Sequence, residues 1–241
     1  MTRGIVIAGN ESALSNALEI EAAKRVEHFA VGLIPNRFSE TEGDSGPLPR
    51  RSALRPSGGD NSGWAAAEKA RLPLQWNPGS PISAATLVIA AKNRLEHIDE
   101  ALLICAPPSI RCTIAELPLA DVEVLVNDHV KGWFFLAREL AAVFRNRRGG
   151  ALALVYSDNG AGSGKEDTAD LLGPSSLAAF QALTRSLLAS AFNEPYITIG
   201  FAGSESGDEA GFAAFIFKQL EEGNRRNNGK LHKYGKLNFF R

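Results

Sequence analysis

The 241-residue chain is short of cysteine, of net charge and of long apolar runs, and each shortage excludes a class of protein. Its two cysteines, Cys105 and Cys112, have no second pair and no clustered histidines, which excludes a disulfide framework and a zinc site and predicts buried thiols. The 26 basic and 27 acidic residues leave a net charge of −1, so neither nucleic acid nor an anionic membrane surface is a favoured partner.

No run of about 18 uncharged apolar residues occurs, as a transmembrane helix would require. The opening MTRGIVIAGNES turns polar after one short apolar strand, unlike a signal peptide. We therefore expect a cytoplasmic protein that does not cross a membrane. With 44% apolar and 22% charged residues, the chain has the composition of a globular protein that can bury a sizeable core.

Apolar strands and amphipathic helices alternate along the sequence. Short apolar runs predict strands at 4–8, 29–34, 72–76, 101–105, 151–156, 196–201 and near 237–240. Apolar residues at helical spacing predict helices over 12–26, 64–70, 82–95, 120–145, 175–192 and 210–222. This alternation predicts a single α/β domain over 1–241, with a doubly wound, mostly parallel sheet and helices on both faces. Ligands of such sheets bind at the carboxyl ends of the strands.

Residues 38–63 interrupt the alternation with a stretch rich in glycine, serine and proline that has no periodic apolar face. This composition predicts an irregular loop inserted inside the domain. The loop is either a lid or a tolerated insertion. We favour the insertion, because long surface loops cost little closure entropy.

Several short stretches in or next to the predicted strands and helices succeed one another in a characteristic order. They are 8–15 (AGNESALS), 75–78 (QWNP), 104–107 (ICAP), the helical pair 126–127 (VN), 149–157 (GGALALVYS), 183–187 (LTRSL) and 228–231 (NGKL). In this order they resemble the short-chain dehydrogenase/reductase family, and most closely its ketoacyl reductase branch. The resemblance covers nearly the whole chain and implies the Rossmann-like fold already predicted.

The resemblance implies a nicotinamide nucleotide site whose first turn is degraded. Of the three glycines in the family's TGxxxGxG pattern only Gly9 is kept, since Ala13 and Ser15 replace the others, and Glu11 adds a negative charge. Side chains there would crowd the approach of pyrophosphate to the helix N-terminus. The positions implied to bind the cofactor are Gly9, Ser12, Leu14, Arg37, Asn77 and Ala106. We expect weakened NAD(P) binding or no cofactor at all, and the sequence leaves these alternatives open.

The resemblance places the family's catalytic asparagine and serine at Asn127 and Ser157, but its tyrosine and lysine are absent. Counting back from 183–187 puts Gly173 at the tyrosine and Leu177 at the lysine, and no YxxxK sequence occurs anywhere. Reduction of a carbonyl needs a positioned acid, which the lysine's charge would poise. Gly173 has no proton to supply, and Leu177 carries no charge. Asn127 and Ser157 can also be read as polar groups that satisfy neighbouring backbone.

The leading hypothesis is therefore a non-catalytic or regulatory subunit that forms a homodimer or homotetramer or pairs with an active paralogue. The resemblance implies that helices 120–145 and 175–192 pair across a twofold axis, and the apolar cluster 133–135 fits such an interface.

One alternative is a divergent NAD(P)-dependent oxidoreductase that reduces a carbonyl substrate with a substitute acid from 165–167. The second is a small-ligand sensor whose cleft lies under loop 38–63. The four histidines, His129 among them, have no metal-ligand spacing, so we expect no metal and no role for them.

Overall fold

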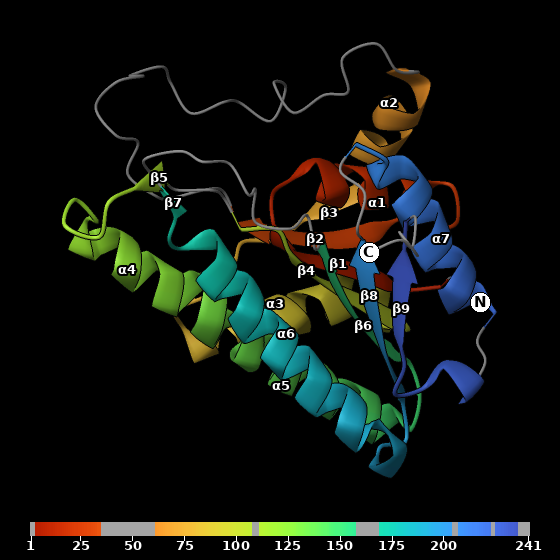
Figure 1. Cartoon of the computed structure of the whole chain (residues 1–241). Coiled ribbons are helices and arrows are strands. Elements are labelled where there is room, and N and C mark those ends of the chain that lie inside the picture. Colours follow the sequence, from red (N-terminus) through yellow and green to blue (C-terminus); the bar gives the residue numbers. More distant parts are fainter. Residues whose placement is uncertain are drawn as a thin grey trace.

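The computed structural model (Figure 1) describes residues 3–34, 61–107, 111–157, 169–203, 207–222 and 225–235. Seven parallel strands form the central sheet in the order β3-β2-β1-β4-β6-β8-β9. They are β1 (Ile5–Asn10), β2 (Phe29–Ile34), β3 (Arg71–Pro73), β4 (Glu100–Cys105), β6 (Ala151–Ser157), β8 (Ile197–Gly203) and β9 (Leu231–Tyr234). The chain builds outward in both directions from β1 and β4, so a topological switch point lies between these strands. The predicted doubly wound sheet is confirmed.

Helices cover both faces of the sheet (Figure 1). One face carries α1 (Ala13–Ala23), α2 (Asn61–Ala70) and α7 (Glu209–Glu221), and α1 contacts both of the others. The other carries α3 (Pro81–Leu95), α5 (Gly132–Arg147) and α6 (Gly173–Ser190), with α4 (Leu119–Val126) before α5. Short helical turns η3 (Ala191–Asn193) and η4 (Arg225–Asn227) follow α6 and α7. None of the helices in the described ranges is long and apolar enough to cross a membrane.

The long helix predicted over 120–145 is interrupted. Residues Asn127–Lys131 form one turn of π-helix, η2, between α4 and α5. A π-turn accommodates an extra residue and so rotates the helical face that follows it. After the π-turn Trp133 is 1% exposed and packs in the core, whereas its neighbour Phe134 is 53% exposed.

Other boundaries need smaller corrections. Helix α2 begins at Asn61, so the last residues of the predicted loop 38–63 are helical, and the rest of that loop lies outside the described residues. The third strand ends at Pro73 instead of residue 76, and its last bond to β2 is the one that the Leu74 amide donates to the Val31 carbonyl.

Two further differences concern strands. The last strand is β9, whereas the strand predicted near 237–240 falls outside the described residues. A small antiparallel pair, β5 (Arg111–Cys112) with β7 (Ala169–Asp170), was not predicted, because two-residue strands carry no periodicity.

Candidate functional site

The carboxyl ends of β1, β4 and β6 lie side by side at one edge of the sheet. Gly9 pairs with Ile104 in the β1–β4 ladder, and β4 pairs with β6 up to the last residue of β4. Asn10, Ala106 and Ser157 therefore end or follow three adjacent strands. Parallel α/β sheets bind their ligands at the carboxyl ends of their strands, so this is the candidate site, which we call the switch-point edge.

Gly9 is required here by the close approach of β1 to β4. Its φ of 142° is a conformation that other residues avoid, and a Cβ on it would lie 2.1 Å from the carbonyl oxygen of Ile104. Gly9 thus has a structural role, since it lets β1 lie against β4 and positions the next residue, Asn10.

Ser12 and Ser15 close the N-terminus of α1 with their own side chains. The Ser15 amide donates to Ser12 Oγ at 3.1 Å, and the Ser12 amide donates to Ser15 Oγ at 2.9 Å. These bonds form a capping box, which satisfies amides that could otherwise face an anion. Leu14, another position implied to bind the cofactor, is 4% exposed and belongs to the core beneath α1.

Asn10 joins three segments at the switch-point edge, namely the end of β1, the residue after β4 and the π-turn η2. Its Oδ1 accepts a hydrogen bond from the Ala106 amide at 3.1 Å, and its Nδ2 lies 3.2 Å from Nδ1 of His129 in η2. A backbone amide can only donate, so the Asn10 oxygen must face Ala106 and its NH2 group must face His129. His129 Nδ1 is then the acceptor, and the proton of the neutral imidazole is on Nε2.

His129 is buried, with only 3% of its surface exposed. Burial lowers its pKa to about 4, because the charged form loses its hydration. The imidazole is therefore neutral at pH 7. This histidine could not be singled out from the sequence, since its partner Asn10 lies 119 positions earlier in the chain.

Asn127 lies at the start of the same π-turn, where its Oδ1 accepts a hydrogen bond from Lys131 Nζ at 3.0 Å. A Cβ on Gly79 would come within 3.3 Å of the Asn127 Cβ and 3.6 Å of Asn77 Oδ1. Asn77 itself is exposed. The fold thus brings Asn77 and Asn127 together before α3, whereas the residue that η2 brings to the end of β1 is His129.

The head of α6 is occupied by a cap. The Gly173 amide donates to Asp170 Oδ1 at 3.0 Å, and a Cβ on Gly173 would lie 2.4 Å from Asp170 Oδ2. Leu177, one turn further on, packs against the core of this face. Gly173, where the resemblance implies a tyrosine, is therefore part of a helix cap. Leu177, where it implies a lysine, makes an apolar contact.

None of the three tyrosines, all of which lie in described segments, stands at the head of α6. Tyr156 is 5% exposed and packs edge-on against Phe180 in the core. Tyr196 lies before β8, at its amino end. The Tyr234 hydroxyl donates to Asp208 Oδ2 at 2.5 Å, between β9 and α7.

The described residues offer neither a reactive thiol at Cys105 nor a metal site. Burial raises the pKa of Cys105 to about 12, so its thiol is not a nucleophile. Within the described ranges, no group of three or more histidine, cysteine or acidic side chains could hold a metal ion. Arg37 and 165–167 lie outside the described residues.

A doubly wound parallel sheet with a turn and a helix N-terminus at its switch point is the architecture of the dinucleotide-binding α/β proteins. Among these, the chain has the fold of the short-chain dehydrogenases/reductases. It matches such an enzyme from Mycobacterium marinum with a TM-score of 0.71 and 14% identity, over 96% of this chain and 92% of that chain. No protein-family model and no curated protein matches the sequence.

Two further solved structures show the same fold. Acetoin dehydrogenase YohF from Salmonella typhimurium has a TM-score of 0.67 at 14% identity, over 97% of this chain and 95% of that chain. The structure of ElxO with NADP bound has a TM-score of 0.70 at 12% identity, over 97% of each chain.

Proposed function

We propose that this protein is a reductase-fold subunit that does not reduce ketones and acts as a non-catalytic or regulatory partner. The observation that carries the proposal is the head of α6. There Asp170 caps the helix against Gly173, and Leu177 packs into the core. Hydride transfer to a carbonyl needs a proton donor at the developing oxyanion, and neither residue at the implied positions can supply one.

The turn after β1 supports weakened binding of a nicotinamide nucleotide. An open turn presents free amides to pyrophosphate, whereas the Ser12–Ser15 capping box uses its own hydroxyls on these amides. The described residues of this turn therefore fit the phosphate group poorly. The fold itself accommodates a nucleotide, as the structure of ElxO with NADP bound illustrates.

Titration with NADH and NADPH, followed by nucleotide fluorescence, tests the cofactor part of the proposal. A panel of small ketones that includes acetoin, followed by nucleotide absorbance, tests turnover. We expect weak or no binding and no oxidation of NADH or NADPH above background. Tight binding together with turnover of any ketone would overturn the proposal.

A divergent NAD(P)-dependent oxidoreductase is the second candidate, and the Asn10–His129 contact is the observation that favours it. This neutral imidazole in contact with the last residue of β1 is a polar group that the sequence did not single out. In the turnover assay this candidate predicts slow ketone reduction that His129→Phe abolishes.

A further inference from the structure

A cavity of about 470 Å³ lies at the amino ends of the strands, opposite the switch-point edge. The residues that line it precede three neighbouring parallel strands, namely Arg3 before β1, 25–28 before β2 and 94–96 before β4. Small-molecule sites have volumes of about 300–1,000 Å³, so the cavity is large enough for an organic ligand. We call it the amino-end cavity.

Three arginines line the amino-end cavity, and each is already held by a hydrogen bond to the protein. The acceptors are the Glu100 carboxylate for Arg3, the Glu21 and Glu221 carboxylates for Arg25, and the Pro73 carbonyl for Arg94. An arginine that is fixed in this way loses little further side-chain entropy when it binds a ligand. The three guanidinium groups are therefore preorganised.

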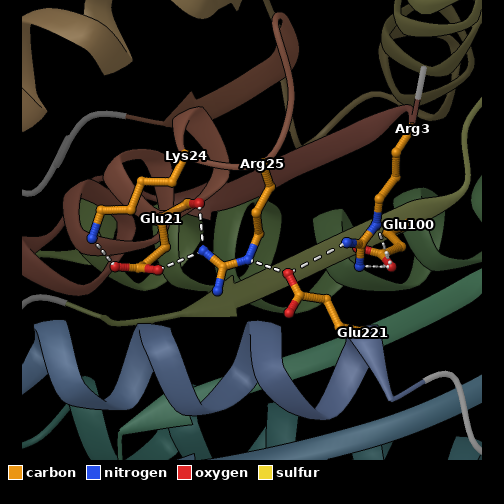
Figure 2. A network of polar contacts seen from close by, with 6 residues as sticks. All are labelled: Arg3, Glu21, Lys24, Arg25, Glu100 and Glu221. Carbon is orange, nitrogen blue, oxygen red and sulfur yellow. Dashed lines mark hydrogen bonds and ion pairs between the residues drawn. The ribbon is translucent and has the colours of Figure 1, made fainter.

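Each of these guanidinium groups keeps one terminal nitrogen that makes no hydrogen bond to the described residues. In Arg25 it is Nη2, since Nε and both contacts of Nη1 go to other partners, as Figure 2 shows. In Arg94 it is also Nη2, and in Arg3 it is Nη1, which lies 3.7 Å from Glu221. Three donors from three segments match the three terminal oxygens of a phosphate monoester, whereas a carboxylate offers only two oxygens.

The other lining residues favour a ligand with an organic part. Val26 and Leu95 are partly buried and add apolar surface beside the arginines. The two lining carboxylates, Glu27 and Glu96, are exposed to solvent, which screens their charge. An apolar group next to the phosphate would therefore gain contacts that inorganic phosphate cannot make.

We propose that the amino-end cavity binds a small organic phosphate monoester. Arg3, Arg25 and Arg94 donate hydrogen bonds to its phosphate oxygens, and Val26 and Leu95 contact its organic part. The cavity is separate from the switch-point edge, where the resemblance implies a nucleotide. The inference therefore goes beyond the proposed function and does not depend on it.

Titration of the ¹⁵N-labelled chain at pH 7, followed by backbone amide shifts, tests the proposal. Phenyl phosphate is the test ligand, and inorganic phosphate, benzoate and benzyl alcohol are the comparisons. We expect phenyl phosphate to cause saturable shifts in 25–28 and 94–96. Its Kd should be at least about fivefold lower than that of inorganic phosphate or benzoate, and benzyl alcohol should cause no shift there.

Arg94→Gln is the main variant, because this exposed side chain bonds only the Pro73 carbonyl and its loss leaves the fold intact. We expect the Kd for phenyl phosphate to rise by at least about tenfold, the loss of one charge-assisted hydrogen bond. Arg138→Gln is the matched control, since its side chain is 78% exposed on α5 and does not line the cavity. Its Kd should stay within about twofold of wild type.

Val26→Ala tests the apolar part of the site. We expect it to weaken phenyl phosphate by about threefold and to leave the Kd of inorganic phosphate unchanged, because only the phenyl ring contacts this side chain. Equal losses for both ligands would show that the organic part does not lie against Val26 and would contradict this part of the proposal.

Four results would overturn the inference. They are no saturable shift in 25–28 and 94–96 at millimolar phenyl phosphate, unchanged binding by Arg94→Gln, an equal loss in Arg138→Gln, and benzoate or benzyl alcohol binding as tightly as phenyl phosphate. The turnover assay decides the proposed function separately, because it concerns the switch-point edge and these shifts concern the opposite end of the sheet.

Discussion

At the scale of single residues, the lowered pKa of His129 makes the stability of the folded protein depend on pH. The pKa of this histidine in the folded protein is about 4, against 6.5 for an unperturbed histidine. The unfolded chain therefore takes up a proton at a higher pH than the folded chain does. The stability that the neutral His129 contributes is fully present above pH 6.5 and is lost as the pH falls from 6.5 to about 4.

We expect this one group to lower the free energy of unfolding by about 3 kcal/mol between pH 7 and pH 4. Urea unfolding at intervals between these values measures the slope. His129→Phe should flatten it within that window, while the control His28→Gln, at a 53% exposed side chain, should keep the wild-type slope. Parallel curves for wild type and His129→Phe would show that another group causes the acid sensitivity.

A second residue-scale prediction concerns Gly9. Gly9→Ala places a Cβ 2.1 Å from the Ile104 carbonyl oxygen at a φ of 142°, so clash and backbone strain add. We expect a loss of about 3 kcal/mol or more in urea unfolding. Gly149→Ala is the matched control, because nothing lies within 4 Å of its added Cβ and the change should stay within about 1 kcal/mol. A stable Gly9→Ala protein would refute the account of the β1 turn.

At the scale of elements, the spacing of apolar residues was sufficient to predict the helices and strands that are uninterrupted. The strand 29–34 and the helix ending at residue 95 were predicted to within a residue, since apolar runs bounded by turn residues specify them. The π-turn was not predictable, because its residues are compatible with an ordinary helix. The role of Asn127 came from the family resemblance and stays a prediction, whereas the contact of His129 with Asn10 becomes visible only in the folded chain.

The capping box of α1 gives the element-scale prediction. Ser12→Ala removes the acceptor for the Ser15 amide and should cost about 1 kcal/mol in urea unfolding. Ser186→Ala is the control, since that hydroxyl is exposed and bonds only the Ala182 carbonyl one turn earlier. The control should change stability by less than about 0.5 kcal/mol. Equal effects of the two changes would mean that the box does not stabilise the turn.

At the scale of the whole molecule, charged residues connect α1 and α7 to the amino ends of β1 and β4 (Figure 2). Arg3, before β1, pairs with Glu100 at the start of β4. Glu221, at the end of α7, lies 2.5 Å from Arg25 and 3.7 Å from Arg3. The network therefore links α1, α7, β1 and β4, which are distant in sequence.

The members of this network should contribute unequally. Arg3→Met leaves Glu100, 7% exposed, without its guanidinium, and we expect a loss of about 3 kcal/mol at pH 7. Burial already raises the pKa of Glu100 and Arg3 opposes that rise, so without Arg3 the pKa increases further. The loss should then diminish as the pH falls through the raised pKa.

Glu221→Gln is the comparison variant, since its side chain is 43% exposed and its pairs are screened by solvent. It should cost less than about 1 kcal/mol in urea unfolding, and less still in high salt. A Glu221→Gln loss as large as that of Arg3→Met would contradict the assignment of the main contribution to the buried pair.

Assembly is the last whole-molecule prediction, and it concerns the surface of α5 and α6. Phe134 projects from α5 with 53% of its surface exposed, and α6 exposes the small residues Ala178 and Ala182 on a face that covers no part of the sheet. A second copy of the chain would bury this surface, and a contact between small residues permits close approach of helices. We expect size-exclusion chromatography with light scattering to give twice or four times the chain mass of 25.8 kDa.

Phe134→Glu should shift this species towards the monomer, because a buried interface does not accommodate an unpaired carboxylate. Ile114→Glu is the matched control, since Ile114 is 77% exposed and lies outside α5 and α6. Its mass should remain that of wild type. A strictly monomeric wild-type protein at micromolar concentration would refute the predicted oligomer, and an equal response to both substitutions would place the interface elsewhere on the molecule.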